Sequence, residues 1–185
     1  MRVAIGVEYD GNAFEGWQIQ PHGRTVQNAV EHALAQIAQA PVKLVCAGRT
    51  DTGVHASMQV AHFDTVAKRP LEAWVRGVNS HLPASVCVLW AVEVGDDFHA
   101  RFSAESRRYR YVLLNRRIRP GLLGGRVGWT HGTLDEEAMR SAAACLVGEH
   151  DFTSFRAAEC QAKSPVRFMH SVEVRRQGDI VLFDF

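Results

Sequence analysis

The order of hydrophobic patterns along the first 94 residues constrains the fold more than any other feature of the sequence. Residues 2–10 alternate apolar and polar side chains, with Val3, Ile5, Val7 and Tyr9 on one face, which predicts a strand. Apolar residues then keep helical spacing to residue 37 after Thr25, a good N-cap. The pattern continues with strands over 42–47 and 57–64, a helix over 71–81 that begins after Pro70, and a strand over 85–94. The order β-α-β-β-α-β predicts a ferredoxin-like unit with an antiparallel sheet.

The remaining sequence begins to repeat this order. Residues 106–114 are patterned as a strand, 134–147 as a helix, and 166–175 and 180–185 as two further strands. This gives β-α-β-β, a second ferredoxin-like unit that is incomplete. We therefore predict an α+β protein with two such units, at residues 1–104 and 105–185, and we expect the chain to be truncated at its C-terminus.

Composition restricts the function classes more than it identifies one. The net charge is +1, and the four cysteines form no C-x-x-C pair, which favours a reducing compartment and a cytoplasmic location. No apolar run reaches 18 residues, so we predict no membrane partner. Neither zinc-ligand spacings nor glycine-rich nucleotide loops occur, so we predict no metal and no cofactor.

Residues 48–56, between the second and third predicted strands, form the first candidate site. This loop reads G-R-T-D-T-G-V-H-A, with Asp51 between two glycines and Arg49 two residues earlier. Asp-Thr-Gly is also ordinary turn composition, so the loop considered alone favours a plain turn. The same triplet occurs in aspartic proteases, whose two aspartates share a proton. That interpretation is disfavoured, because Arg49 would hold Asp51 ionised and no second triplet occurs.

Residues 105–126 form a second candidate site, because they contain seven arginines and one acid. Arginine binds phosphate through paired hydrogen bonds, and a neighbouring aromatic side chain can stack on an unpaired base. Arg107, Arg108 and Arg110 with Tyr109 therefore predict an RNA contact, and the alternative is a solvated basic face. For Tyr111 we predict a core position.

Several ordered motifs now resemble one family. They are G-R-T-D-T-G-V-H at 48–55, E-Y-D-G at 8–11 with G-W-Q at 16–18, F-H-A-R-F at 98–102, R-R-Y-R-Y at 107–111 and D-F-T-S-F-R at 151–156. Together they resemble the tRNA pseudouridine synthase A family, and the likeness extends over essentially the whole chain.

The resemblance implies isomerisation of uridine to pseudouridine at positions 38 to 40 of the tRNA anticodon stem-loop, by a homodimer without metal or cofactor. It makes Asp51 the nucleophile, lets Arg49 help hold the target base out of the helix, and places Tyr109 against that base. It also implies that two segments contact tRNA, namely Phe98, His99, Ala100, Arg101 and Phe102, and Glu159, Cys160, Gln161, Ala162 and Lys163.

Family members continue with a helix carrying an H-H-M-V-R-N-type motif and a final strand, for which this sequence has no counterpart. A non-catalytic tRNA-binding module left by truncation is therefore the alternative function. An aspartate-dependent hydrolase is a third, remote option.

Overall fold

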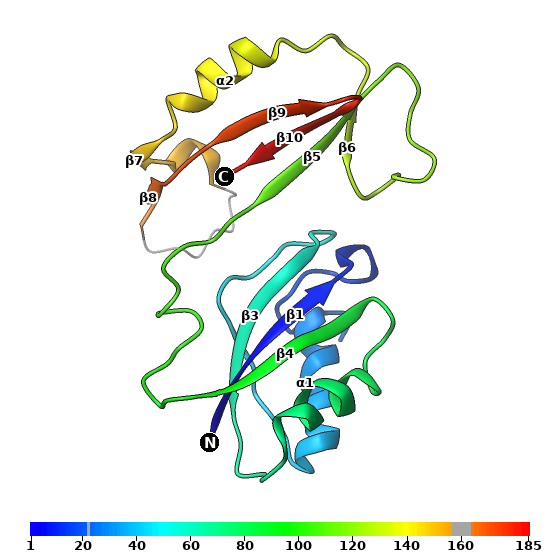
Figure 1. Cartoon of the computed structure of the whole chain (residues 1–185), viewed down its shortest axis with the longest axis vertical. Coiled ribbons are helices and arrows are strands. Elements are labelled where there is room, and N and C mark those ends of the chain that lie inside the picture. Colours follow the sequence, from blue (N-terminus) through cyan, green and yellow to red (C-terminus); the bar gives the residue numbers. More distant parts are fainter. Residues whose placement is uncertain (22, 157–163) are drawn as a thin grey trace. The chain divides into compact units, whose positions relative to one another are not determined.

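The computed structural model describes residues 1–21, 23–156 and 164–185. The chain forms two compact units, Met1–Arg107 and Arg108–Phe185, and each is described by itself (Figure 1). Among the described residues, no helix is both long enough and apolar enough to cross a membrane.

The first unit is built on a four-stranded antiparallel sheet in the order β2-β3-β1-β4. Its strands are β1 (Arg2–Tyr9), β2 (Val45–Cys46), β3 (Ala56–Asp64) and β4 (Val86–Val94). The helix α1 (Val26–Ala38) connects β1 to β2, and the π-helical segment η2 (Ala73–Gly77) lies between β3 and β4. A short 3-10 turn, η1 (Gly11–Ala13), follows β1.

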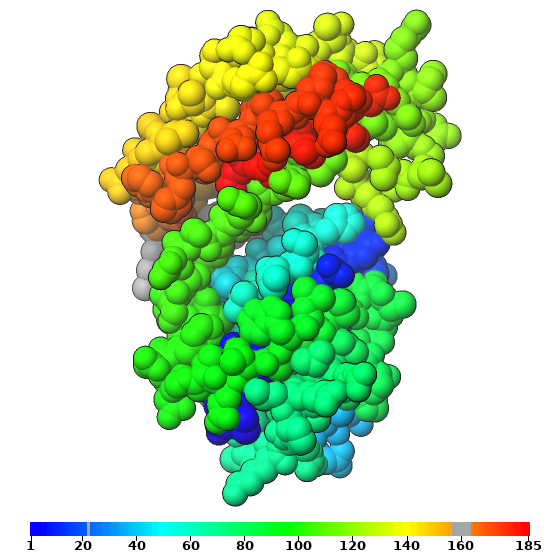
Figure 2. Space-filling view, in the orientation of Figure 1, coloured from blue at the N-terminus to red at the C-terminus, as the bar shows by residue number. Residues whose placement is uncertain are grey.

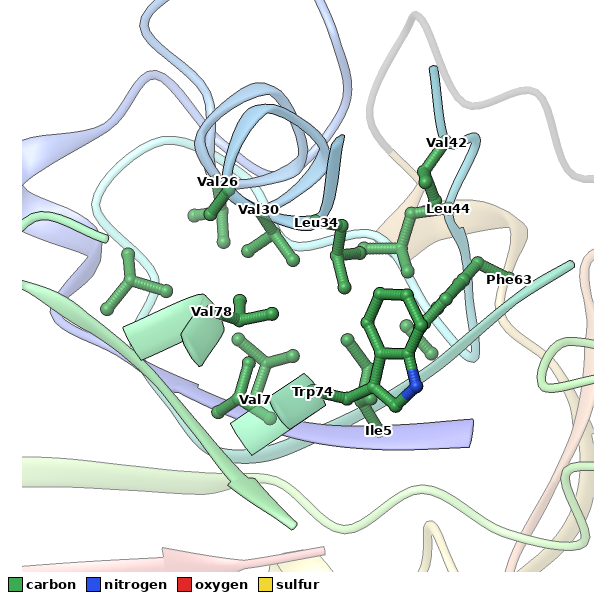
Figure 3. Packing of buried hydrophobic residues seen from close by; sticks show 14 of the residues in the cluster. Ile5, Val7, Val26, Val30, Leu34, Val42, Leu44, Phe63, Trp74 and Val78 are labelled. Carbon is green, nitrogen blue, oxygen red and sulfur yellow. The ribbon is translucent and has the colours of Figure 1, made fainter. Parts of the chain in front are cut away.

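Both helical segments pack on the same face of this sheet. The predicted inner face of β1 is confirmed, because Val3, Ile5 and Val7 are fully buried. They contact the apolar side of α1 and the side chain of Trp74 from η2 (Figure 3). Thr25 also caps α1 as predicted, since its side chain accepts a hydrogen bond from the backbone of Asn28. The core of the first unit therefore follows directly from the alternating and helical patterns of the sequence.

The second predicted strand is much shorter than expected. Val42 and Leu44 are buried as the pattern suggested, but only Val45 and Cys46 pair with β3. At Leu44, two side chains of α1 take the place of a strand partner. The Leu44 amide donates a hydrogen bond to the Glu31 carboxylate at 2.8 Å, and the Gln27 side chain donates one to the Leu44 carbonyl at 3.1 Å.

The second unit has a four-stranded sheet in the order β6-β5-β10-β9. These strands are β5 (Arg110–Asn115), β6 (Gly128–Thr130), β9 (Glu173–Gln177) and β10 (Ile180–Asp184). The helix α2 (Glu136–Ala144) packs along β9 (Figure 1). A separate two-stranded sheet consists of β7 (Gly148–Asp151) and β8 (Val166–Met169), and a 3-10 turn, η3 (Thr153–Phe155), follows β7.

Two predictions for this unit are wrong. The sheet is not wholly antiparallel, because β5 and β6 pair in parallel. The predicted strand over 166–175 is two strands in different sheets, because β8 pairs with β7 whereas β9 pairs with β10. Alternation continues across the break between them, and alternation alone does not say which partner a strand takes.

Candidate active site

Asp51 is exposed on the loop that joins β2 to β3. Arg49 and Thr52 of the same loop are exposed as well. The loop closes a turn in which the amide of Val54 donates to the carbonyl of Asp51 at 3.1 Å. Gly53 has a φ of 78°, a conformation that glycine adopts without strain. The carboxylate is thus presented to solvent by a hydrogen-bonded turn.

The first residue of this loop is fixed by a side chain of β3. Gln59 donates to the carbonyl of Gly48 at 2.5 Å and accepts from its amide at 3.4 Å. The side chain is nearly buried, and the adjacent amide of Ala47 donates to the carbonyl of Val60 at 2.8 Å. The side chain of Gln59, on the core-facing side of β3, therefore attaches the start of the loop to the sheet.

Thr50, the neighbour of Asp51, is held by the segment that follows β1. The hydroxyl groups of Tyr9 and Thr50 are 2.8 Å apart, and the amide of Trp17 donates to the carbonyl of Thr50 at 2.9 Å. Gly16 has a φ of 89°, and a Cβ atom on it would lie 3.0 Å from the same carbonyl oxygen. Both the backbone and the side chain of Thr50 are consequently fixed.

The end of the loop lies against Gly11. A Cβ atom at this position would lie 2.2 Å from the carbonyl oxygen of Val54, so only glycine fits without a shift. The Nδ1 atom of His55 is 3.1 Å from the amide of Gly11 and 3.1 Å from a carboxylate oxygen of Asp10. A neutral Nδ1 accepts from that amide, and a protonated one donates to the carboxylate. Either protonation state keeps the loop end attached to this segment.

These contacts explain the motifs at 8–11 and 16–18, which sequence analysis recognised without assigning them a role. Gln59 and the hydroxyl group of Tyr9 also support the loop, and neither support was predicted from the sequence. One signal was present, because Gln59 is a polar residue in the otherwise apolar face that includes Ala61 and Phe63. A polar side chain on a core face must find hydrogen-bond partners, and here they are backbone groups of the loop.

The 98–102 segment is anchored to the same unit through its middle residue. Ala100 is buried, and its amide donates to Nδ1 of His62 at 3.2 Å. Burial lowers the pKa of His62, with a further contribution from nearby Arg2, which favours the neutral form that can accept this bond. Arg2 also donates to the carbonyl of Phe98 at 2.8 Å.

The two side chains that follow Ala100 are exposed, whereas Phe98 and His99 before it are half-buried against His62. Phe102 is 77% exposed and stacks on His99 with ring centroids 4.3 Å apart. The guanidinium of Arg101 lies 5.6 Å from the centre of the Phe102 ring. A cation beside an exposed aromatic ring suits a nucleotide, and the RNA contact of this segment stays a prediction.

The predicted basic residues differ in how their guanidinium groups are used. Arg107 donates twice to the carbonyl of Ala47, at 3.1 and 2.5 Å. Arg110 forms a two-fold ion pair with Asp184 at 2.6 and 2.9 Å, whereas Arg108 is exposed. The hydrogen bonds from Arg110, joined by Arg175, lower the pKa of Asp184 to about 2. Arg107 and Arg110 thus have structural roles, and their RNA contacts stay predictions.

Tyr109 belongs to the second unit, where it extends the pairing of β5 with β10. Its amide donates to the carbonyl of Phe185 at 2.6 Å and its carbonyl accepts from the Phe185 amide at 3.0 Å. The two rings stack with centroids 5.9 Å apart, and Tyr109 is 44% exposed. A contact between Tyr109 and the substrate base stays a prediction. The predicted core position of Tyr111 is wrong, because this ring is 52% exposed above Gly128.

Two points remain, the predicted tRNA-contacting segment 159–163 and the metal ligands. Glu159, Cys160, Gln161, Ala162 and Lys163 lie outside the described residues. Among the residues that are described, no group of three or more His, Cys, Asp or Glu side chains could hold a metal ion.

A family model described as tRNA pseudouridine synthase matches residues 5–103 and 142–185. The chain belongs to this family. The matched segments include the Asp51 loop, all of its supports and residues 98–102, but not Tyr109.

Curated relatives match over the full 185 residues. The chain is 64% identical to tRNA pseudouridine synthase A of Aromatoleum aromaticum and covers 70% of that protein. It is 63% identical to the enzyme of Dechloromonas aromatica and 60% identical to that of Chromobacterium violaceum, covering 71% of each.

Proposed function

We propose that this chain isomerises uridine to pseudouridine in tRNA, with the carboxylate of Asp51 as the nucleophile. One observation carries the proposal: Asp51 is exposed on a loop fixed at its start, middle and end by Gln59, Trp17 and Gly11. Preorganisation of this kind is what a catalytic carboxylate requires, because misplacement of a reacting group costs rate. The identity of at least 60% to three tRNA pseudouridine synthases supports the reaction class.

The reaction breaks the bond between N1 of uracil and C1′ of ribose and forms a bond between C5 and C1′. The proton on C5 passes to solvent, and N1 gains one, so the overall change is an isomerisation without oxidation or reduction. A carboxylate can assist by attacking C1′ of the sugar or the base itself, and both routes produce a covalent intermediate. The exposed side chain of Asp51 suits either route.

The uridine must leave its stack before Asp51 can reach it. Unstacking costs a few kcal/mol, which the enzyme must offset by contacts to the flipped base and to the vacated space. We assign the second role to Arg49, on the same loop as Asp51, and the first to Tyr109, whose ring is partly exposed. The aromatic and cationic side chains of 98–102 would contact the flanking RNA.

The finer assignments follow from the family resemblance. They are a target among positions 38 to 40 of the anticodon stem-loop, a homodimer as the working form, and a cytoplasmic location. We also assign the first unit to the ferredoxin-like class. Its element order β-α-β-β-α-β, antiparallel strand order β2-β3-β1-β4 and helices on one face support this.

Tritium release from tRNA containing 5-tritiated uridine tests the proposal, because pseudouridine formation frees the C5 hydrogen. We expect the 185-residue chain to release tritium, and release to stop when uridines 38 to 40 are replaced by cytidine. A transcript with the same number of replacements in the acceptor stem is the matched control. Binding of tRNA without any release would contradict the proposal and indicate the non-catalytic module instead.

A further inference from the structure

The strand β3 supports two surface regions from its opposite faces. Gln59, on the core-facing side, holds the start of the Asp51 loop. His62 lies three positions later, so its side chain is on the other face of the sheet. There it contacts the chain that follows β4, which Figure 2 shows in green at the surface of the first unit. One strand is therefore attached both to the Asp51 loop and to the 98–102 segment.

Residues 99–103 form a turn that is closed by its own hydrogen bonds. The amide of Ser103 donates to the carbonyl of His99 at 2.7 Å, and the hydroxyl group of Ser103 accepts from the His99 amide at 3.1 Å. The Nδ1 atom of His99 accepts from the amides of Arg101 and Phe102, both at 3.3 Å. Both of these residues are exposed. Because the turn holds its own shape, its attachment to the sheet decides where their side chains lie.

Two side chains from neighbouring strands attach this part of the chain to the sheet. Arg2 of β1 donates to the carbonyls of Asp96 and Phe98, at 2.6 and 2.8 Å, and so holds the chain before the turn. His62 accepts from the amide of Ala100 at 3.2 Å and so holds the turn itself. Ala100 is 3% exposed and His62 4%. Loss of the acceptor would therefore leave a buried amide without a partner, which is costly.

The surroundings of His62 favour an unprotonated ring. Burial lowers its pKa from the ordinary value of 6.5, and the charge of Arg2 and the neighbouring His99 lower it further. The carboxylate of Asp64 acts in the opposite direction and is itself paired with Arg2. The residues that pair with His62 on β1 and β2 are uncharged, namely Ala4 and Val45.

We propose that His62 is a positioning residue for tRNA binding, because its bond to the Ala100 amide sets the place of Arg101 and Phe102. The RNA contact of these two side chains rests on the proposed function, and the attachment of the turn rests on the contacts above. A neutral imidazole has one ring nitrogen that accepts a hydrogen bond, whereas a protonated ring has none. Protonation of His62 therefore releases the turn, and the affinity for tRNA falls with it.

Two substitutions at position 62 separate the acceptor from the ring. His62→Leu removes the acceptor, and we expect tRNA affinity to fall about tenfold, which corresponds to the loss of one buried hydrogen bond. His62→Asn keeps an oxygen near the place of Nδ1 and should bind tRNA as the wild type does above pH 6.5. In His62→Leu the KM for tritium release should rise with the loss of affinity, whereas kcat should change less. Fluorescence anisotropy of labelled tRNA with the full chain measures the affinity.

The pH dependence of affinity tests the mechanism, because the wild type titrates at this position and His62→Asn does not. His62 is neutral above pH 6.5 and becomes protonated as the pH falls through its lowered pKa. The ratio of wild-type to His62→Asn affinity should be constant above pH 6.5 and fall toward about one tenth as the pH approaches about 5. Other histidines titrate in both proteins and cancel in the ratio. His32→Asn, at an exposed position of α1, is the matched control and should keep the wild-type profile.

A ratio that stays constant over this pH range would overturn the proposal, and so would wild-type affinity in His62→Leu. Thermal unfolding of each variant shows whether the fold is retained, and the pH comparison does not require His62→Leu to fold. Failure of the proposal is distinguishable from failure of the proposed function. Tritium release with a constant ratio would refute only the role of His62, whereas a pH-dependent ratio without tritium release would refute only the reaction.

Discussion

The two units of this chain are stabilised in different ways. All buried apolar residues of the described chain except Leu114, Val174 and Val181 lie in the first unit. There β1, α1 and η2 enclose a continuous core that includes Trp74 (Figure 3), and Trp17 belongs to the same cluster of buried residues. In the second unit α2 has no buried residue. Besides its backbone pairing, the sheet of this unit carries a charged cluster in which Arg110 and Arg175 bind Asp184.

This difference matches the roles proposed for the units. The first unit carries the Asp51 loop, and the residues that fix the loop extend from its core, as Tyr9, Trp17 and Gln59 do. A close-packed interior transmits position accurately because it resists deformation. The second unit supplies exposed cations and aromatic rings, which need less exact placement to contact a nucleic-acid backbone. Rigid packing therefore lies beneath the proposed chemistry, and the second unit adds exposed charged and aromatic side chains to the RNA contacts proposed for residues 98–102 of the first unit.

Equivalent truncations in the two sheets test the contrast most strongly. Val7→Ala in the central strand β1 should cost about 2 to 3 kcal/mol of unfolding free energy, because the lost methyl groups leave a cavity in a packed core. Val174→Ala in the edge strand β9 should cost only about 1 kcal/mol, because its surroundings can relax. Urea unfolding followed by hydrogen exchange of each sheet measures both. Equal losses would mean that the second unit is packed as firmly as the first.

Removing the main charge cluster of the second unit should have a smaller effect. Asp184→Asn should destabilise this unit by about 1 kcal/mol at neutral pH, a value reduced by the exposure of both arginines. The pKa of Asp184 is lowered from 3.8 to about 2. Its ion pairs therefore stabilise the fold fully when the pH is above 3.8, and this stabilisation is lost as the pH falls toward 2.

The wild-type protein should therefore lose this stability between about pH 4 and pH 2, and the variant should show a flatter profile in that window. Glu173→Gln is the matched control, because its contact with Arg175 is exposed and 3.6 Å long. Urea titrations across the pH range measure both variants. Identical pH profiles of stability for wild type and Asp184→Asn would show that the charge cluster does not stabilise this unit.

Sequence patterns predicted those parts of the fold that depend on local periodicity. β1, α1 and β4 were predicted because a buried face repeats every two or about every four residues along each. The length of β2 was not predictable, because it depends on Gln27 and Glu31 of α1 binding the backbone of Leu44. The parallel strand β6 was missed because three residues are too short to show a pattern.

The candidate site divides in the same way. Asp51 was predicted as a site residue because it lies in a local motif, and the structure shows it exposed on a loop. The supports of the loop were not predictable, because they join residues far apart in the sequence, such as Gly11 with Val54. Nor does a run of arginines reveal which of them are paired, since Asp184 lies 74 positions after Arg110.

The central claim is that the first unit holds Asp51 in place for chemistry, and not for folding or binding. Tritium release by Asp51→Asn, measured with the tRNA affinity and thermal unfolding of the same variant, tests it most directly. The account predicts a loss of at least about a thousandfold in the rate of release, with unfolding and affinity unchanged, because the side chain is exposed and the substitution is isosteric. Release at the wild-type rate would contradict it.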